Sequence, residues 1–154
     1  MFKAKKAIAL IVILIMICGT AIANQVGWVL CNPNKGMVNV RFDPNKNATI
    51  IGYRECGDTV ILDGKREGRW LHCVDLHLEN EEGWIYAGYV SNCPVTVGTR
   101  YMTTTVGKLK VRADVDGRML KRLPKGKELT VYAWSESWAV TNVGYVQTKY
   151  LSER

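Results

Sequence analysis

The stretch that decides the fold is GWIYAGYV at residues 83–90, which returns as GYVQTKYL at residues 144–151. Each copy begins with glycine, continues with an aromatic and a β-branched residue, and reaches a second aromatic after three further residues. A glycine leading into such residues is typical of a turn followed by a strand. Because the copies lie 61 positions apart, the sequence predicts two copies of one small unit.

The segments before the two copies also correspond, and their composition predicts short strands separated by turns. Residues 50–60 match residues 119–129 without a gap, which places Gly57 against Gly126 in equivalent turns. The strands expected in the first unit are Val38–Arg41, Thr59–Leu62 and Trp70–Val74, with a second turn over residues 63–68 and an inserted polar segment at residues 75–82. Their counterparts are Leu109–Arg112, Leu129–Tyr132 and Trp138–Thr141, with a turn over residues 133–137.

Residues 83–90 are expected to form one continuous strand. Because successive side chains of a strand point to opposite faces, Trp84 and Tyr86 would lie on one face and Tyr89 on the other.

The first 23 residues are expected to form a secretory signal peptide rather than part of the fold. Lysines lie among the first six residues, residues 7–18 are apolar, and Ala21-Ile22-Ala23 is a small-residue cleavage pattern. An uncleaved membrane anchor and a lipoprotein modified at Cys18 are the alternatives. The apolar run is shorter than the roughly 20 residues that a membrane-spanning helix needs. The exported chain would therefore begin at Asn24.

Charge is unevenly divided between the two units. Residues 24–95 carry seven Lys and Arg against nine Asp and Glu, whereas residues 96–154 carry eleven against five. The net charges of −2 and +6 favour the second unit as the one that contacts an anionic polymer outside the cell, and the alternative is an ordinary solvated surface. Its basic series is Lys108, Lys110, Arg112, Arg118, Lys121, Arg122, Lys125 and Lys127.

Four cysteines remain after the signal peptide, and an even number in an exported chain predicts two disulfides. Their separations of 25, 17 and 20 positions lack the close pairs that zinc sites use, so no metal is expected. Four cysteines allow three pairings. We favour Cys56–Cys73, across a predicted hairpin, together with Cys31–Cys93, which flank the first unit.

The first unit contains, in order, VNVR, a glycine turn, an apolar strand, a tryptophan and GWIxxxYV. This order resembles that of the bacterial SH3-like (SH3b) domain. The second unit, with LKVR and GYVQTKYL, is similar, and the resemblance covers about residues 26–92 and 99–152. It implies an all-β chain of two small SH3-like β-barrels in tandem, each of five to six strands, at residues 24–95 and 96–154 after the signal peptide at 1–23. It also implies an exported or envelope protein whose modules bind peptidoglycan or other surface ligands.

The residues do not indicate catalysis. His72 and Cys73 are adjacent, and adjacent side chains of a strand point to opposite faces, so they would not form a nucleophilic pair. We expect no enzyme activity and no cofactor.

Binding would instead use exposed aromatic side chains and the polar residues near them. The candidates are Asn39, Arg41, Trp70, Trp84, Tyr86 and Tyr89 in the first unit, and Arg112, Trp134, Trp138 and Tyr145 in the second. The alternative for these residues is structural: the rings would form the cores and the two arginines would make ion pairs.

The sequence therefore predicts a secreted or envelope-located, non-enzymatic tandem module that binds peptidoglycan or another cell-envelope component. The alternative is a protein–protein interaction or structural module that acts as partner or inhibitor of a separate envelope protein. Neither a nucleic acid partner nor a permanent membrane span after signal cleavage is expected.

Overall fold

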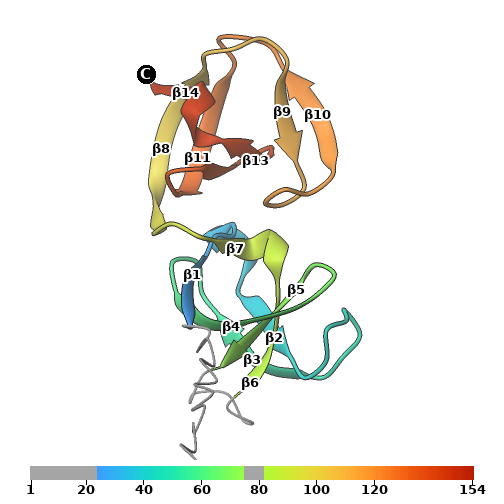
Figure 1. Cartoon of the computed structure of the whole chain (residues 1–154). Coiled ribbons are helices and arrows are strands. Elements are labelled where there is room, and N and C mark those ends of the chain that lie inside the picture. Colours follow the sequence, from blue (N-terminus) through green and yellow to red (C-terminus); the bar gives the residue numbers. More distant parts are fainter. Residues whose placement is uncertain (1–23, 75–81) are drawn as a thin grey trace, which may run out of the picture.

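The computed structural model describes residues 24–74 and 82–154. This part of the chain is all-β and forms two seven-stranded antiparallel sheets, the first within residues 25–91 and the second within residues 96–153 (Figure 1). The predicted signal peptide and residues 75–81 of the predicted insertion lie outside the described residues. No helix within the described ranges is long and apolar enough to cross a membrane.

The two sheets have the same strand order. The first runs β3-β2-β6-β5-β4-β1-β7 and the second β10-β9-β13-β12-β11-β8-β14. The strands of the first are β1 (Gln25–Val29), β2 (Val38–Arg41), β3 (Ile50–Arg54), β4 (Thr59–Glu67), β5 (Trp70–Val74), β6 (Glu82–Tyr86) and β7 (Val90–Ser91). Those of the second are β8 (Thr96–Thr104), β9 (Leu109–Arg112), β10 (Met119–Leu123), β11 (Glu128–Trp134), β12 (Trp138–Thr141), β13 (Gly144–Gln147) and β14 (Leu151–Glu153).

The structure confirms the predicted all-β class and corrects the predicted strand count and closure. Seven strands replace the expected five to six, because β1 and β8 precede the arginine strands and the short β7 and β14 begin at the last residue of each copy of the motif. Each sheet curls round on itself (Figure 1), but the recorded pairing leaves β3 and β7, and likewise β10 and β14, as edges. The hydrogen bonds of the described residues therefore do not close either sheet into a barrel.

Two local predictions fail where backbone geometry overrides the pattern. The predicted turn over residues 63–68 is mostly strand, because β4 continues to Glu67 through an irregularity between Leu62 and Arg66, and the chain reverses only at Gly68. The predicted strand over residues 83–90 also stops at Tyr86, where a 3₁₀ turn, η2 (Ala87–Tyr89), begins. This turn brings the rings of Tyr86 and Tyr89 together, with centroids 5.8 Å apart, instead of on opposite faces.

The glycine that begins each copy of the motif is required by close strand contact. A Cβ on Gly144 would lie 2.7 Å from the carbonyl oxygen of Arg112, and φ at this residue is +133°. A Cβ on Gly83 would lie 2.8 Å from the Val40 side chain. Since real Cβ atoms do not approach so closely, only glycine lets β6 lie against β2 and β13 against β9.

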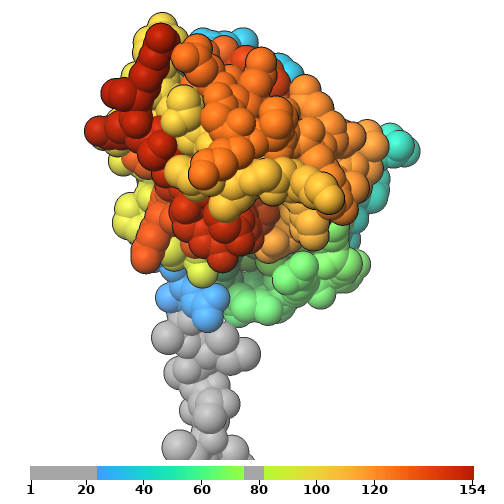
Figure 2. Space-filling model, turned by 90° about the horizontal axis from the view of Figure 1, so that it is seen from above, coloured from blue at the N-terminus to red at the C-terminus, as the bar shows by residue number. Residues whose placement is uncertain are grey.

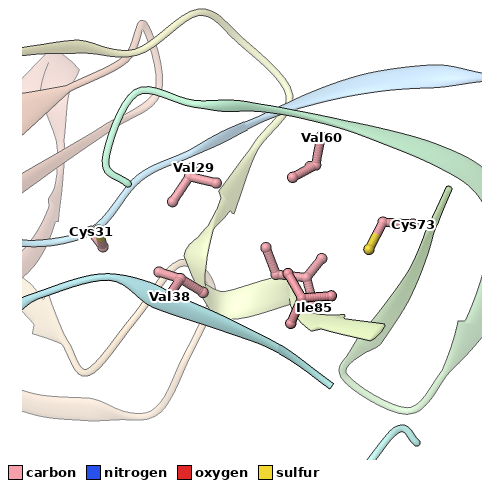
Figure 3. Close-up of a cluster of buried hydrophobic side chains, with 7 residues drawn as sticks. Val29, Cys31, Val38, Val60, Cys73 and Ile85 are labelled. Atoms are coloured by element: carbon pink, nitrogen blue, oxygen red, sulfur yellow. The ribbon is translucent and has the colours of Figure 1, made fainter. Parts of the chain in front are cut away.

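Each sheet curls around its own hydrophobic core. In the first, Figure 3 shows buried side chains from five strands and from the segment after β1, including Val29, Val60 and Ile85. The second core is built by Leu109, Val111, Leu123, Leu129, Val131, Ala139 and Val146. Branched aliphatic side chains dominate both cores, as expected for residues that pack on pleated surfaces.

A third core joins the two halves. Leu30, from just after β1, packs with Val115, Ala133, Trp138, Val140 and Tyr145 of the second half. Leu30 is fully buried, and the Tyr145 hydroxyl donates a 3.0 Å hydrogen bond to its carbonyl oxygen. The two halves therefore share apolar surface as well as a short linker at residues 92–95.

Candidate binding cleft between the two halves

A cleft of about 720 Å³ lies along the junction of the halves. We call it the junction cleft. Its first-half lining comes mainly from the segment before β2, from β2 itself, and from β5, β6 and η2. It is lined by Cys31, Asn32, Lys35, Gly36, Met37, Val38, Asn39, Arg41, Lys46, Trp70, Tyr86 and Tyr89 of the first half, and by Ala113, Leu120, Val140, Thr141, Asn142, Val143, Gly144 and Tyr145 of the second.

Three aromatic rings from the first half form a continuous surface in the cleft. Trp70 and Tyr86 are paired across β5 and β6, and their rings meet edge to face with centroids 5.5 Å apart. Tyr89 continues this row from η2, because the 3₁₀ turn places it beside Tyr86. All three side chains are half-buried, so each has one surface in the protein and one open to a ligand.

The charges of the cleft are positive. Lys35 and Lys46 are exposed, and Arg41 lies half-buried at the end of β2. The Arg41 guanidinium donates one 2.7 Å hydrogen bond to the Ala48 carbonyl oxygen, which fixes its position. No carboxylate occurs among the described lining residues, so the arrangement favours an anionic ligand.

The second half supplies an apolar and amide wall. Val140 and Tyr145 are buried in the shared core, while Asn142 is exposed at the cleft. Burial raises the pKa of Tyr145, whose hydroxyl is already committed to the Leu30 carbonyl. Tyr145 therefore contributes shape. The Asn142 side-chain oxygen accepts a 3.2 Å hydrogen bond from the Thr130 backbone N–H, so Asn142 offers mainly its amide N–H groups to a ligand.

A polar clamp beside the cleft holds the halves together. The Arg69 guanidinium lies 2.7 Å from an Asp114 carboxylate oxygen and donates to the Val115 carbonyl oxygen at 2.6 Å. It also lies 4.9 Å from the centre of the Tyr86 ring. The Val115 backbone N–H donates to the Gly88 carbonyl oxygen at 3.0 Å. These contacts orient Tyr86 relative to the second half.

Six of the ten predicted ligand-binding residues line the junction cleft: Asn39, Arg41, Trp70, Tyr86, Tyr89 and Tyr145. Arg112 and Trp138 line a different pocket of about 380 Å³, which lies within the second half. We call it the second pocket.

The two remaining predicted residues, Trp84 and Trp134, line neither site. Trp84 packs edge to face on His72 with centroids 4.8 Å apart, and Trp134 lies beneath the Arg100 guanidinium at 4.2 Å.

The basic series of the second half is mostly solvated. All of its members except the half-buried Arg112 are exposed, and Figure 2 shows this half from above, with residues of the β9–β10 region in amber and orange. Lys108, Lys110 and Arg112 line the second pocket, whereas Lys125 lines neither site. The cations of the junction cleft belong to the first half, whose net charge is negative. The net charge of each half therefore did not indicate where these cations lie.

His72 and Cys73 lie in separate environments. The His72 Nδ1 atom is 2.9 Å from an Asp63 carboxylate oxygen, and its ring is almost fully buried. The Cys73 sulfur donates to the Gly83 carbonyl oxygen at 3.3 Å. Hydrogen bonds from the Lys65 backbone N–H and from His72 outweigh the effect of desolvation, so the pKa of Asp63 is lowered. This arrangement orients His72 Nδ1 toward Asp63, and its Nε2 lies 3.6 Å from a Glu82 carboxylate oxygen.

The predicted disulfide pairing is wrong. Neither Cys56–Cys73 nor Cys31–Cys93 is bonded, and Cys56 lies against Cys31 instead. Figure 3 places Cys31 and Cys73 at opposite ends of the first core, so Cys56 is remote from Cys73. Cys93 lies near Glu136 of the second half, with sulfur and oxygen 3.9 Å apart. The expected hairpin geometry failed because Cys56 precedes β4 at the turn next to the end of β1.

Sequence reasoning missed Lys35, Lys46 and Asn142 of the cleft, and the Arg69–Asp114 clamp. The lysines and the asparagine come from loops, where no periodic pattern marks the direction of a side chain. The clamp joins residues 45 positions apart, in different units of the repeat. Only the packing of one half on the other brings these residues together.

No family model matches the sequence, and no curated protein matches it. Among solved structures, NlpC1 from Trichomonas vaginalis is similar with a TM-score of 0.35 and 16% sequence identity, over 85% of this chain and 46% of that one. NlpC2 from Trichomonas vaginalis is similar with a TM-score of 0.37 and 14% identity, over 86% of this chain and 49% of that one. The chain therefore spans just under half the length of either structure.

Proposed function

We propose that the chain is an exported, non-enzymatic binding protein of the cell envelope, built from two SH3-like units, whose junction cleft takes an anionic, amide-bearing fragment of peptidoglycan. The observation that carries the proposal is the lining of the cleft. It combines three half-buried aromatic rings with three cations, and its described residues include no carboxylate.

The chemistry of the cleft matches that of a glycan-linked peptide. Trp70, Tyr86 and Tyr89 offer ring faces to sugar C–H groups and to peptide planes. Lys35, Lys46 and the remaining N–H groups of Arg41 offer partners for carboxylates, and hydrogen bonds that involve ionised groups are about twice as strong as neutral ones.

Asn39 of the first half and Asn142 of the second half both line the cleft, and their side-chain amides add polar groups to its two walls. A ligand that touches both walls would also favour the packed arrangement of the halves, since it binds only when they are together.

The test measures retention of the full exported chain on purified sacculi, with the Trp70→Ala and Lys46→Glu variants beside it. We expect each variant to lose about tenfold in affinity, because central aromatic and charged anchors carry most of the binding free energy. Lys125→Glu is the matched control: it makes the same charge change on an exposed lysine that lines neither site.

Two results would contradict the proposal. One is equal weakening by Lys46→Glu and Lys125→Glu, which would indicate diffuse charge attraction. The other is capture of a protein from envelope extracts after the sacculi are removed, with no retention on sacculi themselves, which would favour the partner or inhibitor alternative.

Moderate salt should weaken binding, because exposed charges are screened over about 8 Å at physiological ionic strength.

A further inference from the structure

The second pocket occupies the position in the second half that the junction cleft occupies in the first. Residues 106–110 correspond to residues 35–39 in the repeat, and Arg112 corresponds to Arg41. Trp138, Gln147 and Tyr150 correspond in the same way to Trp70, Tyr86 and Tyr89. All nine residues that line the second pocket thus have an equivalent that lines the junction cleft.

The strand registers show that this correspondence is structural. Arg41 is paired with Trp84 across β2 and β6, and Arg112 with Tyr145 across β9 and β13. Trp70 is paired with Tyr86 across β5 and β6.

Trp138 is paired with Gln147 in the same way across β12 and β13. A 3₁₀ turn, η3 (Thr148–Tyr150), follows β13 as η2 follows β6, and it carries Tyr150 to the place of Tyr89.

The two arginines are also held alike. The Arg112 guanidinium donates to the Gly117 carbonyl oxygen at 2.6 Å, and that of Arg41 to the Ala48 carbonyl oxygen at 2.7 Å. In each half one N–H group is used to fix the arginine against the following loop.

The second pocket has the same kinds of lining residue as the junction cleft, namely cations, aromatic rings and amides, but in different numbers. Lys108, Lys110 and Arg112 supply three cations, and Gln147 supplies an amide. Two rings also line the pocket: Tyr150 is half-buried, whereas Trp138 is buried and packs mainly in the shared core. No carboxylate occurs among its described lining residues. Its volume is about half that of the junction cleft, because residues of the second half form an extra wall for the first site only.

We propose that the second pocket is a second binding site, which takes a shorter anionic, amide-bearing unit of the same polymer. The inference rests on the proposed function, because the class of ligand is carried over from the junction cleft. The equivalent positions keep an aromatic–cationic lining although their residues differ, for example Lys110 for Asn39 and Gln147 for Tyr86. One chain would then hold a polymer at two points.

Calorimetric titration of the full exported chain with a soluble disaccharide–tetrapeptide monomer tests this directly. We expect two bound monomers per chain, one of which is lost in Lys110→Glu and in Lys108→Glu, both at exposed positions. Lys46→Glu should remove the other. Lys125→Glu is again the control, and circular dichroism of each variant checks folding.

The outcomes separate this inference from the proposed function. One bound monomer that is lost in Lys46→Glu and unaffected by Lys110→Glu would overturn the second site and leave the junction cleft standing. No bound monomer, together with no retention on sacculi, would overturn both. If Lys125→Glu lost as much monomer binding as the other variants, the result would indicate diffuse charge attraction and contradict both sites.

Discussion

Oxidation of the chain should join Cys31 to Cys56, a pairing that differs from both predicted ones. The Cys31 backbone N–H lies 3.4 Å from the Cys56 sulfur, and the Cys56 thiol donates to the Cys31 carbonyl oxygen at 2.9 Å. Cys31 is buried and Cys56 is half-buried, so Cys56 is the thiol that an oxidant reaches first.

The reaction with oxidised glutathione is a two-step exchange. The Cys56 thiolate attacks one sulfur of the oxidant, forming a mixed disulfide and releasing one glutathione thiolate. Cys31 loses its proton and attacks the Cys56 sulfur, which releases the second glutathione. Two protein thiols are oxidised, the oxidant is reduced to two thiols, and the protons from the protein pass to the leaving thiolates.

The magnitude follows from the separation of the two residues. The link closes a loop of about 25 residues, for which the chain-entropy relation gives about 3.5 kcal/mol of stabilisation at 25 °C. Since about 1 kcal/mol moves the melting temperature of a domain of this size by about 4 °C, the melting temperature should rise by about 14 °C. Little rearrangement opposes this gain, because the two residues are already in contact.

Peptide mapping without reductant identifies the link, and thermal unfolding with and without reductant measures its effect. The Cys31→Ala and Cys56→Ala variants should lose the difference between the two unfolding curves, whereas Cys93→Ala should keep it. Recovery of a Cys31–Cys93 or Cys56–Cys73 peptide would refute the reasoning. So would identical unfolding of the oxidised and reduced protein.

Three further predictions concern other parts of the chain. Gly144→Ala should destabilise the fold by about 1–3 kcal/mol, because the new Cβ meets a carbonyl oxygen at a strained φ. Chemical denaturation measures this loss, and Gly107→Ala is the control, because its Cβ would meet open space. The contact with Cys31 lowers the pKa of Cys56 to about 7, so its alkylation rate should rise with pH through this value, and Cys31→Ala should move the rise to higher pH. An unmoved profile would contradict that cause. Mass spectrometry of the exported protein should find Asn24 as its first residue, and an intact start at Met1 would contradict signal cleavage.

The repeat made much of the fold predictable. The strands β2, β5, β9 and β12 have the predicted bounds. Apolar residues of β2, β5 and β9 alternate toward one core, whereas β12 is buried on both faces, with Ala139 in the second core and Trp138 and Val140 in the shared core. The predicted turns at Gly57 and Gly126 are present, each with φ in the left-handed region. These features are local, so a short stretch of sequence contains the information that specifies them.

The candidate site was only partly predictable, since it depends on how the two halves pack. The 3₁₀ turn that moves Tyr89 beside Tyr86 has no period that distinguishes it from a continuing strand. The contact of Cys31 with Cys56 follows from the pairing of β4 with β1, and the repeat did not reveal β1. Leu30 and Trp138 meet in the shared core although they are more than a hundred positions apart.

The shared core fixes the distance between the two proposed sites, and this would affect how the chain binds a polymer. Two modules on a flexible tether sample many separations, and the second binding step then depends on an effective concentration set by the tether. Here Leu30, Tyr145 and the Arg69–Asp114 clamp fix the two halves against each other. If both proposed sites bind the polymer, such a chain would select strands whose anionic groups recur at the fixed spacing of the two sites.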